Sequence, residues 1–154
     1  LGSCVAACLR DPVARVGGMN HFMLPHGDTP GTADVGSWHT PADRLRYGSV
    51  AMAELLERVQ RNGGRLERIE VKLFGAARLG HDPGGVGASN ARFAEAFLQR
   101  LGLIPLVRQM GGSWARRVIF HPATGRAFLS ELRDPPPSLM PPALASPSTF
   151  VPVM

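Results

Sequence analysis

The sequence predicts an α+β fold, a mixed α/β sandwich in which two main helices pack on a mostly antiparallel β-sheet. Several short apolar or alternating segments bounded by glycine-rich turns are typical of strands, and two longer segments carry apolar residues at helical spacing. Seven of the 14 prolines fall after Asp134, which favours a disordered, proline-rich C-terminal tail. We therefore expect one domain over residues 1–133 and a tail over residues 134–154.

Length and composition limit the classes of protein to consider. A chain of 154 residues fits one compact domain. With 44% hydrophobic and 19% charged residues it is not a disordered polyelectrolyte, and no apolar run approaches the roughly 18 residues of a membrane span, so we expect no membrane insertion. The chain opens at Leu1 within a segment of strand character, so we expect a preceding strand to be missing; no secretory signal is visible.

The first elements predict a β-hairpin. Residues 3–9 alternate weakly, Asp11-Pro12 favours a type I turn, and residues 18–24 form the returning strand. With the turn on residues 11–14, the numbers of any two directly paired residues add up to 25. Cys4 then lies directly opposite His21.

Two helices are predicted further along. The first starts after a loop at residues 25–41, capped by Thr40-Pro41 or Ser49, and ends at Gly63-Gly64; the second is capped by Ser89 and ends at Gly102. The apolar residues at helical spacing are Met52, Leu55, Leu56 and Val59 in the first helix, and Phe93, Ala94, Phe97, Leu98 and Leu101 in the second.

Further strands complete the predicted sheet. They cover residues 66–74, 103–110, 116–121 and 127–132, separated by glycine-containing turns and by a glycine-rich loop at residues 75–88. That loop lacks the Gly-Lys-Ser/Thr ending of a phosphate-binding loop, so we expect no nucleotide cofactor.

The net charge of +5 raises the question of nucleic acid, because 16 of the 17 basic residues are arginine. The arginines are spread singly along the chain, and Tyr47 is the only tyrosine. Nucleic-acid binders usually concentrate charge on one face and interleave stacking aromatics. We therefore expect no nucleic-acid partner and interpret the arginines as a solvated surface.

Two cysteines, Cys4 and Cys8, lie four residues apart on one predicted strand. At strand rise they are about 13 Å apart, and disulfide Cα atoms lie within about 7 Å, so they cannot bridge each other. Free thiols favour a reducing compartment, and we expect a cytoplasmic protein.

The predicted pairing of Cys4 with His21 has chemical meaning, because a thiolate is a nucleophile and a neighbouring imidazole can move its proton. Two alternatives remain open. A cysteine in a strand of small residues is often buried packing. Metal ligation is the other, but Cys4, Cys8, His21 and His26 match no common zinc spacing, so we expect no metal.

Two sequence blocks closely resemble one known family, the chemoreceptor glutamine deamidases (CheD). The blocks are LGSCV at residues 1–5 and DPVARVGGMNHFMLP at residues 11–25, with His21 17 positions after Cys4. The resemblance continues in collinear order to about Arg133. Its later members are residues 46–48, KLFGAA at 72–77, Gly87, Asn90, Gly111-Gly112, Arg116, Phe120 and Thr124-Gly125.

The resemblance implies a cytoplasmic, cofactor-free enzyme that converts glutamines on the cytoplasmic helices of bacterial chemoreceptors to glutamate. By position, Cys4 would be the nucleophile and His21 the general acid/base. The family's catalytic threonine, six residues before the cysteine, falls before Leu1. We assign substrate-binding or oxyanion roles to Ser3, Gly18 and Asn20.

The resemblance also implies a second partner, a phosphatase of the chemotaxis response regulator. Three positions depart from the family pattern: Ala76 and Ala115, where glycine is common, and Gln109, where aspartate is common. They motivate an alternative hypothesis, a non-catalytic regulatory module that docks on the phosphatase or on a receptor.

Overall fold

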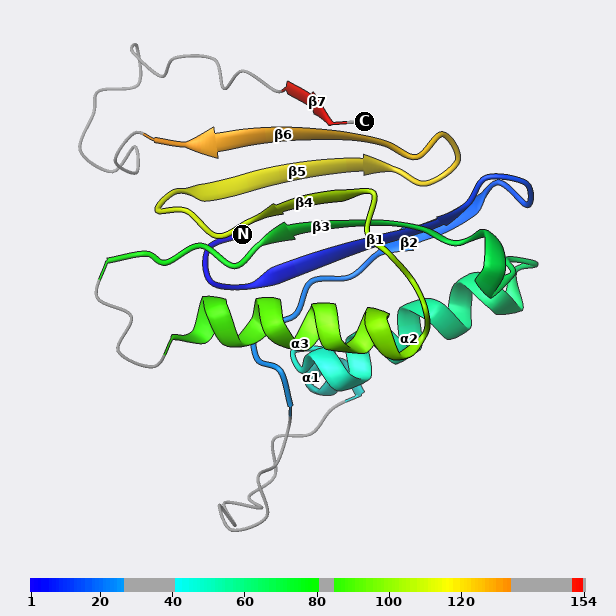
Figure 1. Cartoon of the computed structure of the whole chain (residues 1–154), viewed down its shortest axis with the longest axis horizontal. Coiled ribbons are helices and arrows are strands. Elements are labelled where there is room, and N and C mark those ends of the chain that lie inside the picture. Colours follow the sequence, from blue (N-terminus) through cyan, green and yellow to red (C-terminus); the bar gives the residue numbers. More distant parts are fainter. Residues whose placement is uncertain (27–40, 81–84, 134–150, 154) are drawn as a thin grey trace, which may run out of the picture.

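The computed structural model describes residues 1–26, 41–80, 85–133 and 151–153 (Figure 1). One sheet has the strand order β2-β1-β3-β4 and the other the order β5-β6-β7. The strands are β1 (Val5–Asp11), β2 (Val16–Met19), β3 (Glu70–Gly75), β4 (Val107–Met110), β5 (Ala115–His121), β6 (Arg126–Leu132) and β7 (Val151–Val153). The helices are α1 (Pro41–Arg44), α2 (Gly48–Arg61) and α3 (Val86–Arg100), with a 3₁₀ turn, η1 (Leu66–Arg68).

The predicted α+β fold is confirmed. All strand pairs are antiparallel except β3 with β4, which run parallel because α3 connects them as a crossover. Within the described residues, no helix has the length and apolar content needed to cross a membrane.

Strand β1 divides the core into two sides. Its odd-numbered residues Val5, Ala7 and Leu9 pack with residues of α2 and α3, whereas Cys8 packs with Phe74, Val107 and Ala127. This follows from the alternation of side chains along a strand. The helices therefore cover one face of the first sheet, and β5 and β6 lie on its other side (Figure 1).

Helix starts differ from the prediction. Helix α2 begins after Tyr47, which makes no side-chain capping hydrogen bond, and Gly48 lets Phe93 of α3 approach: a Cβ there would lie 2.6 Å from the ring. Helix α3 begins at Val86 rather than at Ser89, so the predicted cap lies inside its first turn. The ends are as predicted, with Gly102 at φ 70° after α3.

The segment before β3 also differs, because residues 66–68 form a 3₁₀ turn instead of the start of a strand. The buried carboxylate of Asp11 accepts hydrogen bonds from the backbone N–H of Arg65 at 2.9 Å and from the Arg68 side chain at 2.6 and 2.8 Å. The Arg68 guanidinium, assisted by backbone N–H groups and opposed by burial, holds the pKa of Asp11 well below its usual range. A long-range ion pair thus overrides the local strand pattern.

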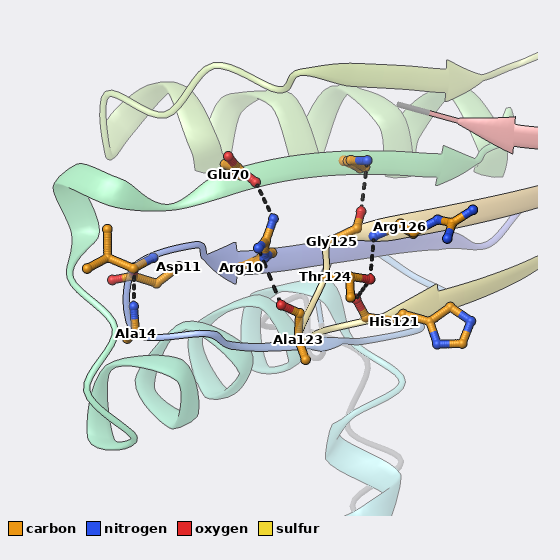
Figure 2. Close-up of polar contacts among 11 residues, drawn as sticks. Arg10, Asp11, Ala14, Glu70, His121, Ala123, Thr124, Gly125 and Arg126 are labelled. Carbon is orange, nitrogen blue, oxygen red and sulfur yellow. Dashed lines mark hydrogen bonds and ion pairs between the residues drawn. The ribbon is translucent and has the colours of Figure 1, made fainter.

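The turn between β5 and β6 docks on the first sheet (Figure 2). The Arg10 guanidinium donates to Glu70 and to the carbonyl of Ala123, both at 3.3 Å, and the Lys72 ammonium donates to the carbonyl of Gly125 at 2.9 Å. Gly125 lies against Arg10, where a Cβ would be 2.6 Å from Nη1. These contacts hold the second sheet on the face that β1 presents away from the helices.

The tail is only partly described. Val151–Val153 forms β7 on the outer edge of β6. Pro152 is compatible with such an edge position. Residues 134–150 and most of the loop at 25–41 lie outside the described residues, as do Thr40, His39 and His81.

Candidate active site

The β1–β2 ladder differs in register from the prediction. Cys8 pairs with Met19, and Asp11 pairs with Val16. Beyond the end of β2, Val5 pairs with Phe22. The numbers of two paired residues therefore add up to 27 rather than the predicted 25. The reason lies in the turn. The carboxylate of Asp11 accepts the N–H groups of Val13 and Ala14 at 2.8 and 3.0 Å, which leaves Asp11 inside the strand and moves the turn toward Arg15.

This two-residue shift leaves His21 on the face on which it was predicted, because side chains alternate with a period of two. Asn20 and Phe22 point to the helix side, where Asn20 contacts Met52 and Phe22 joins the helix-side core. His21, between them, is on the other side. Cys4 directly precedes Val5, the residue that pairs with Phe22, and lies before the start of β1.

Direct opposition of Cys4 and His21 is therefore wrong, because the register places His21 opposite Ala6 and Cys4 lies before the first residue of β1. Cys4 is a free, partly exposed cysteine, and His21 is exposed. Both residues therefore have access to solvent.

The electrostatics of His21 agree with this placement. Partial burial lowers the pKa of its imidazole. The lowered pKa favours a neutral ring, the form that can accept a proton.

Cys8 has the opposite environment. Its thiol is 1% exposed, and burial raises its pKa to about 12, although the Lys72 charge acts in the other direction. A thiol in this state is a poor nucleophile. Of the two cysteines, Cys4 is the one that is suited to chemistry.

The backbone around Cys4 is held by the end of β3. The carbonyls of Gly2 and Cys4 accept hydrogen bonds from the N–H groups of Ala77 and Ala76, each at 2.8 Å. Gly75 has φ 106°, and a Cβ on it would overlap the Cys4 carbonyl oxygen. Ala76 has φ 55°, a conformation that favours glycine and accounts for the glycine common at this position in the resembling family.

Asn90 is a residue whose importance sequence reasoning missed. It is fully buried on α3, and its Nδ2 donates to the carbonyl oxygen of Ser3 at 3.0 Å and to that of Met23 at 2.8 Å. One side chain thus contacts the segments that carry Cys4 and His21. The signal available in the sequence was a polar residue at a core-facing position of an otherwise apolar helix face.

The other predicted site residues are Ser3, Asn20 and Gly18. Ser3 adjoins Cys4, and its side chain is partly exposed. Asn20 is engaged on the helix side: its Oδ1 accepts the Ala7 N–H at 2.9 Å, and its Nδ2 lies 3.3 Å from Met52 Sδ. Gly18 faces α2, where a Cβ would lie 2.8 Å from Leu55. The structure therefore places Gly18 and Asn20 on the helix side of the sheet, and Ser3 directly before Cys4 in the segment that leads into β1.

A pocket of about 250 Å³ lies along the free edge of β2, between that strand and α2. It adjoins His21 but not Cys4. Its lining residues are Met19, Asn20, His21, Leu45, Ala51, Glu54, Leu55 and Arg58.

Metal-ligating residues are dispersed. Over the described residues, no three or more His, Cys, Asp or Glu side chains are grouped so that they could hold a metal ion. His26 packs edge-on against Phe93, with ring centroids 4.8 Å apart, and His121 lies at the far end of β5.

Comparison with known proteins gives consistent results. The chain is 45% identical over 132 residues to the probable chemoreceptor glutamine deamidase CheD of Rhodopseudomonas palustris (strain BisA53), covering 86% of this chain and 59% of the relative. It is 48% identical over 126 residues to the protein of the same name from Caulobacter vibrioides (strain NA1000 / CB15N), covering 82% and 63%. The homologue from Caulobacter sp. (strain K31) is 43% identical over 152 residues, covering 93% and 77%.

The chain thus spans about three fifths of the length of the first two relatives. A family model described as CheD chemotactic sensory transduction matches residues 23–131, from just after His21 to the end of β6. The match covers most of the chain, including both main helices and β3 to β6. The chain therefore belongs to the CheD family.

Proposed function

We propose that this protein is a protein-glutamine deamidase that converts glutamine side chains on the cytoplasmic helices of bacterial chemoreceptors to glutamate, with release of ammonia. The observation that supports the proposal is a free, partly exposed cysteine, Cys4, and an exposed histidine, His21, each directly before one residue of the pair Val5 and Phe22. The names of the relatives, probable chemoreceptor glutamine deamidases, support the substrate class.

The first half of the reaction is acyl transfer to sulfur. Neutral His21 takes the proton of the Cys4 thiol, and the thiolate attacks the carboxamide carbon of the substrate to form a C–S bond. The carbonyl electron pair moves to oxygen, and the tetrahedral oxyanion needs hydrogen-bond donors. We propose that the backbone N–H of Cys4 and the hydroxyl of Ser3, the preceding residue, are these donors.

The second half releases products. The protonated imidazole of His21 gives its proton to the departing nitrogen, the C–N bond breaks, and ammonia leaves. A water molecule, deprotonated by the same imidazole, attacks the thioester. The C–S bond then breaks, Cys4 recovers its proton, and glutamate remains; neither a metal nor an oxidant takes part.

Deamidation has a direct consequence for the receptor. Each reaction adds one negative charge to a bundled helix, which changes the repulsion between neighbouring helices and creates a carboxylate that can be methyl-esterified. We propose that the reaction takes place in the cytoplasm, where these helices lie. We also propose that a phosphatase of the chemotaxis response regulator binds the deamidase and competes with receptors for it.

The test is mass spectrometry of a receptor cytoplasmic fragment incubated with the full-length protein. We expect at least one glutamine to gain the mass difference between an amide and an acid. Cys4→Ala and His21→Ala should abolish that gain, and Cys8→Ser, a matched change at the buried thiol, should keep it. A fragment left unmodified by the wild-type protein contradicts the proposal.

The regulatory-module hypothesis predicts a different result. If Cys4→Ala restores chemotaxis in a deletion strain as well as the wild-type protein does, the chemistry is dispensable and binding is the function. Adding the purified phosphatase to the deamidation assay tests the competition, because the rate should fall as the phosphatase concentration rises.

A further inference from the structure

We propose that Asn90 is a positioning residue, whose one side-chain amide holds the backbone segments of Cys4 and His21 in a fixed mutual arrangement. The inference rests on the function proposed above, since it concerns the same two groups. Asn90 acts through the backbone and touches neither the thiol nor the imidazole.

The hydrogen bonds of Asn90 are the first support. An amide NH₂ group has two hydrogens. In Asn90 one is directed to the carbonyl oxygen of Ser3, at 3.0 Å, and the other to that of Met23, at 2.8 Å. Ser3 directly precedes Cys4, and Met23 lies two residues after His21. The side chain therefore cross-links the two segments at their active ends.

The position of this cross-link in the ladder is the second support. Val5 and Phe22 exchange two backbone hydrogen bonds, at 3.0 and 3.1 Å. In a regular antiparallel ladder the next hydrogen-bonded pair is two residues further along, which would be Ser3 with Leu24. Leu24 instead donates to the carbonyl of Arg46 and accepts from the N–H of Gly48.

The two segments therefore leave the ladder after Val5 and Phe22, one toward β3 and the other toward the start of α2. Asn90, on α3, supplies the cross-link that the ladder no longer provides. Without it, the backbone of Cys4 would be held by the β3 side alone, through Ala76 and Ala77.

Peptide geometry connects this cross-link to the thiol. The Ser3 carbonyl and the Cys4 N–H share one rigid plane. Fixing the carbonyl of Ser3 therefore fixes the position of the Cys4 Cα atom, and the hydrogen bond from Ala76 to the Cys4 carbonyl holds the other side of the residue. Because a displacement of about 1 Å can reduce a rate by about 100-fold, small errors at Ser3 or Met23 matter for the reaction.

The burial of Asn90 is the third support. The residue is fully buried, and among the described residues its Oδ1 has no hydrogen-bond donor. Burying an unsatisfied acceptor is unfavourable, and an apolar residue of similar size would avoid that cost. The two bonds donated by Nδ2 are the feature that only the amide provides.

The location of Asn90 determines what it affects. It is fully buried on α3, so a substrate that approaches the exposed His21 and the partly exposed Cys4 does not contact it. A change at Asn90 should alter the chemical step and leave substrate binding nearly unchanged.

The test compares Asn90→Asp with the wild-type full-length protein. Aspartate has the same shape but, when ionised, cannot donate to either carbonyl. Leu98→Ala, at another buried position of α3, is the control for a general loss of stability. We expect Asn90→Asp to lower kcat for receptor deamidation by about 10- to 100-fold with KM changed less than about threefold. Leu98→Ala should keep kcat within about twofold, because it removes packing without moving either segment.

Each rate is normalised to the folded fraction, measured as the share of Cys8 protected from alkylation, so a partly unfolded variant still gives a result. Asn90→Ser, with one hydroxyl donor, provides a second folded variant and should show a smaller loss. A kcat within about twofold of the wild-type value in folded Asn90→Asp overturns the inference, as does a change confined to KM.

These outcomes are separable from failure of the proposed function. If the wild-type protein does not deamidate receptor fragments, or if Cys4→Ala retains activity, the function fails first. If Cys4→Ala is inactive while Asn90→Asp is fully active, only the positioning role is wrong.

Discussion

Cys4 directly precedes Val5, and His21 directly precedes Phe22, the residue with which Val5 exchanges two backbone hydrogen bonds. The side chains of Val5 and Phe22 are buried on the helix side. Their packing holds the two backbone segments that carry Cys4 and His21. The site therefore depends on the hydrophobic core directly beneath it.

The two cysteines should differ strongly in reactivity. At neutral pH a cysteine-directed alkylating agent should label Cys4 in the native protein and leave Cys8 unlabelled, because burial raises the pKa of Cys8 to about 12. Peptide mass spectrometry after a short exposure measures both. In denaturant the two rates should become similar. Faster labelling of Cys8 in the native state would contradict the burial on which the assignment of Cys4 depends.

The pH dependence of activity should reflect His21. Its neutral form accepts the thiol proton, and partial burial lowers its pKa, so the ring stays neutral to a lower pH than a free imidazole does. As pH falls, kcat/KM should therefore decline only below the ordinary imidazole range. A profile of initial rates from pH 5 to 8, about the range in which histidine titrates, measures this. An acid limb at or above that range would be inconsistent with a neutral His21.

Gly75→Ala should disrupt both stability and the site. The backbone at φ 106° favours glycine, and the new Cβ would overlap the carbonyl oxygen of Cys4. The positive φ costs about 1–2 kcal/mol and the overlap about 1–3 kcal/mol, so we expect a loss of roughly 3 kcal/mol in the free energy of unfolding. Urea denaturation gives the value.

Gly102→Ala is the matched control, since its φ is 70° and a Cβ there would meet nothing within 4 Å. Its free energy of unfolding should fall only by the cost of the positive φ, about 1–2 kcal/mol, and its activity should be unchanged. Equal losses for the two variants would show that the contact with Cys4 is unimportant.

Asp11→Asn should destabilise the protein much more than the loss of a surface ion pair. The carboxylate is fully buried and accepts bonds from Arg68 and from the N–H groups of Val13, Ala14 and Arg65. Glu57→Gln, which removes an exposed pair with Arg61, should change the free energy of unfolding by less than about 1 kcal/mol. Thermal melts at neutral pH compare the two.

The effect of Asp11 should also depend on pH. Because the Arg68 guanidinium holds its pKa below the usual range, the stabilisation is present above the ordinary carboxyl range and is lost as pH falls through the lower, folded-state pKa. The difference in stability between wild type and Asp11→Asn should therefore shrink in strong acid. A constant difference down to strongly acid pH would contradict the assigned role of the charge.

Local sequence determined the identity of most elements in this protein. Apolar residues at helical spacing predicted α2 and α3, and glycines at Gly63 and Gly102 marked the ends of the helices, because those patterns depend on contacts within a few residues. The face of His21 was also predictable, since a register shift of two residues leaves the alternation of side chains unchanged.

Tertiary structure alone decided the register, the start of β3 and the role of Asn90. Asp11 reaches Arg68 across 57 residues, which keeps it in β1 and turns residues 66–68 into a 3₁₀ turn. Asn90 reaches Ser3 across 87 residues and Met23 across 67. Contacts between segments so far apart leave no periodic signal in a single sequence, because they exist only once the sheet and helices have packed.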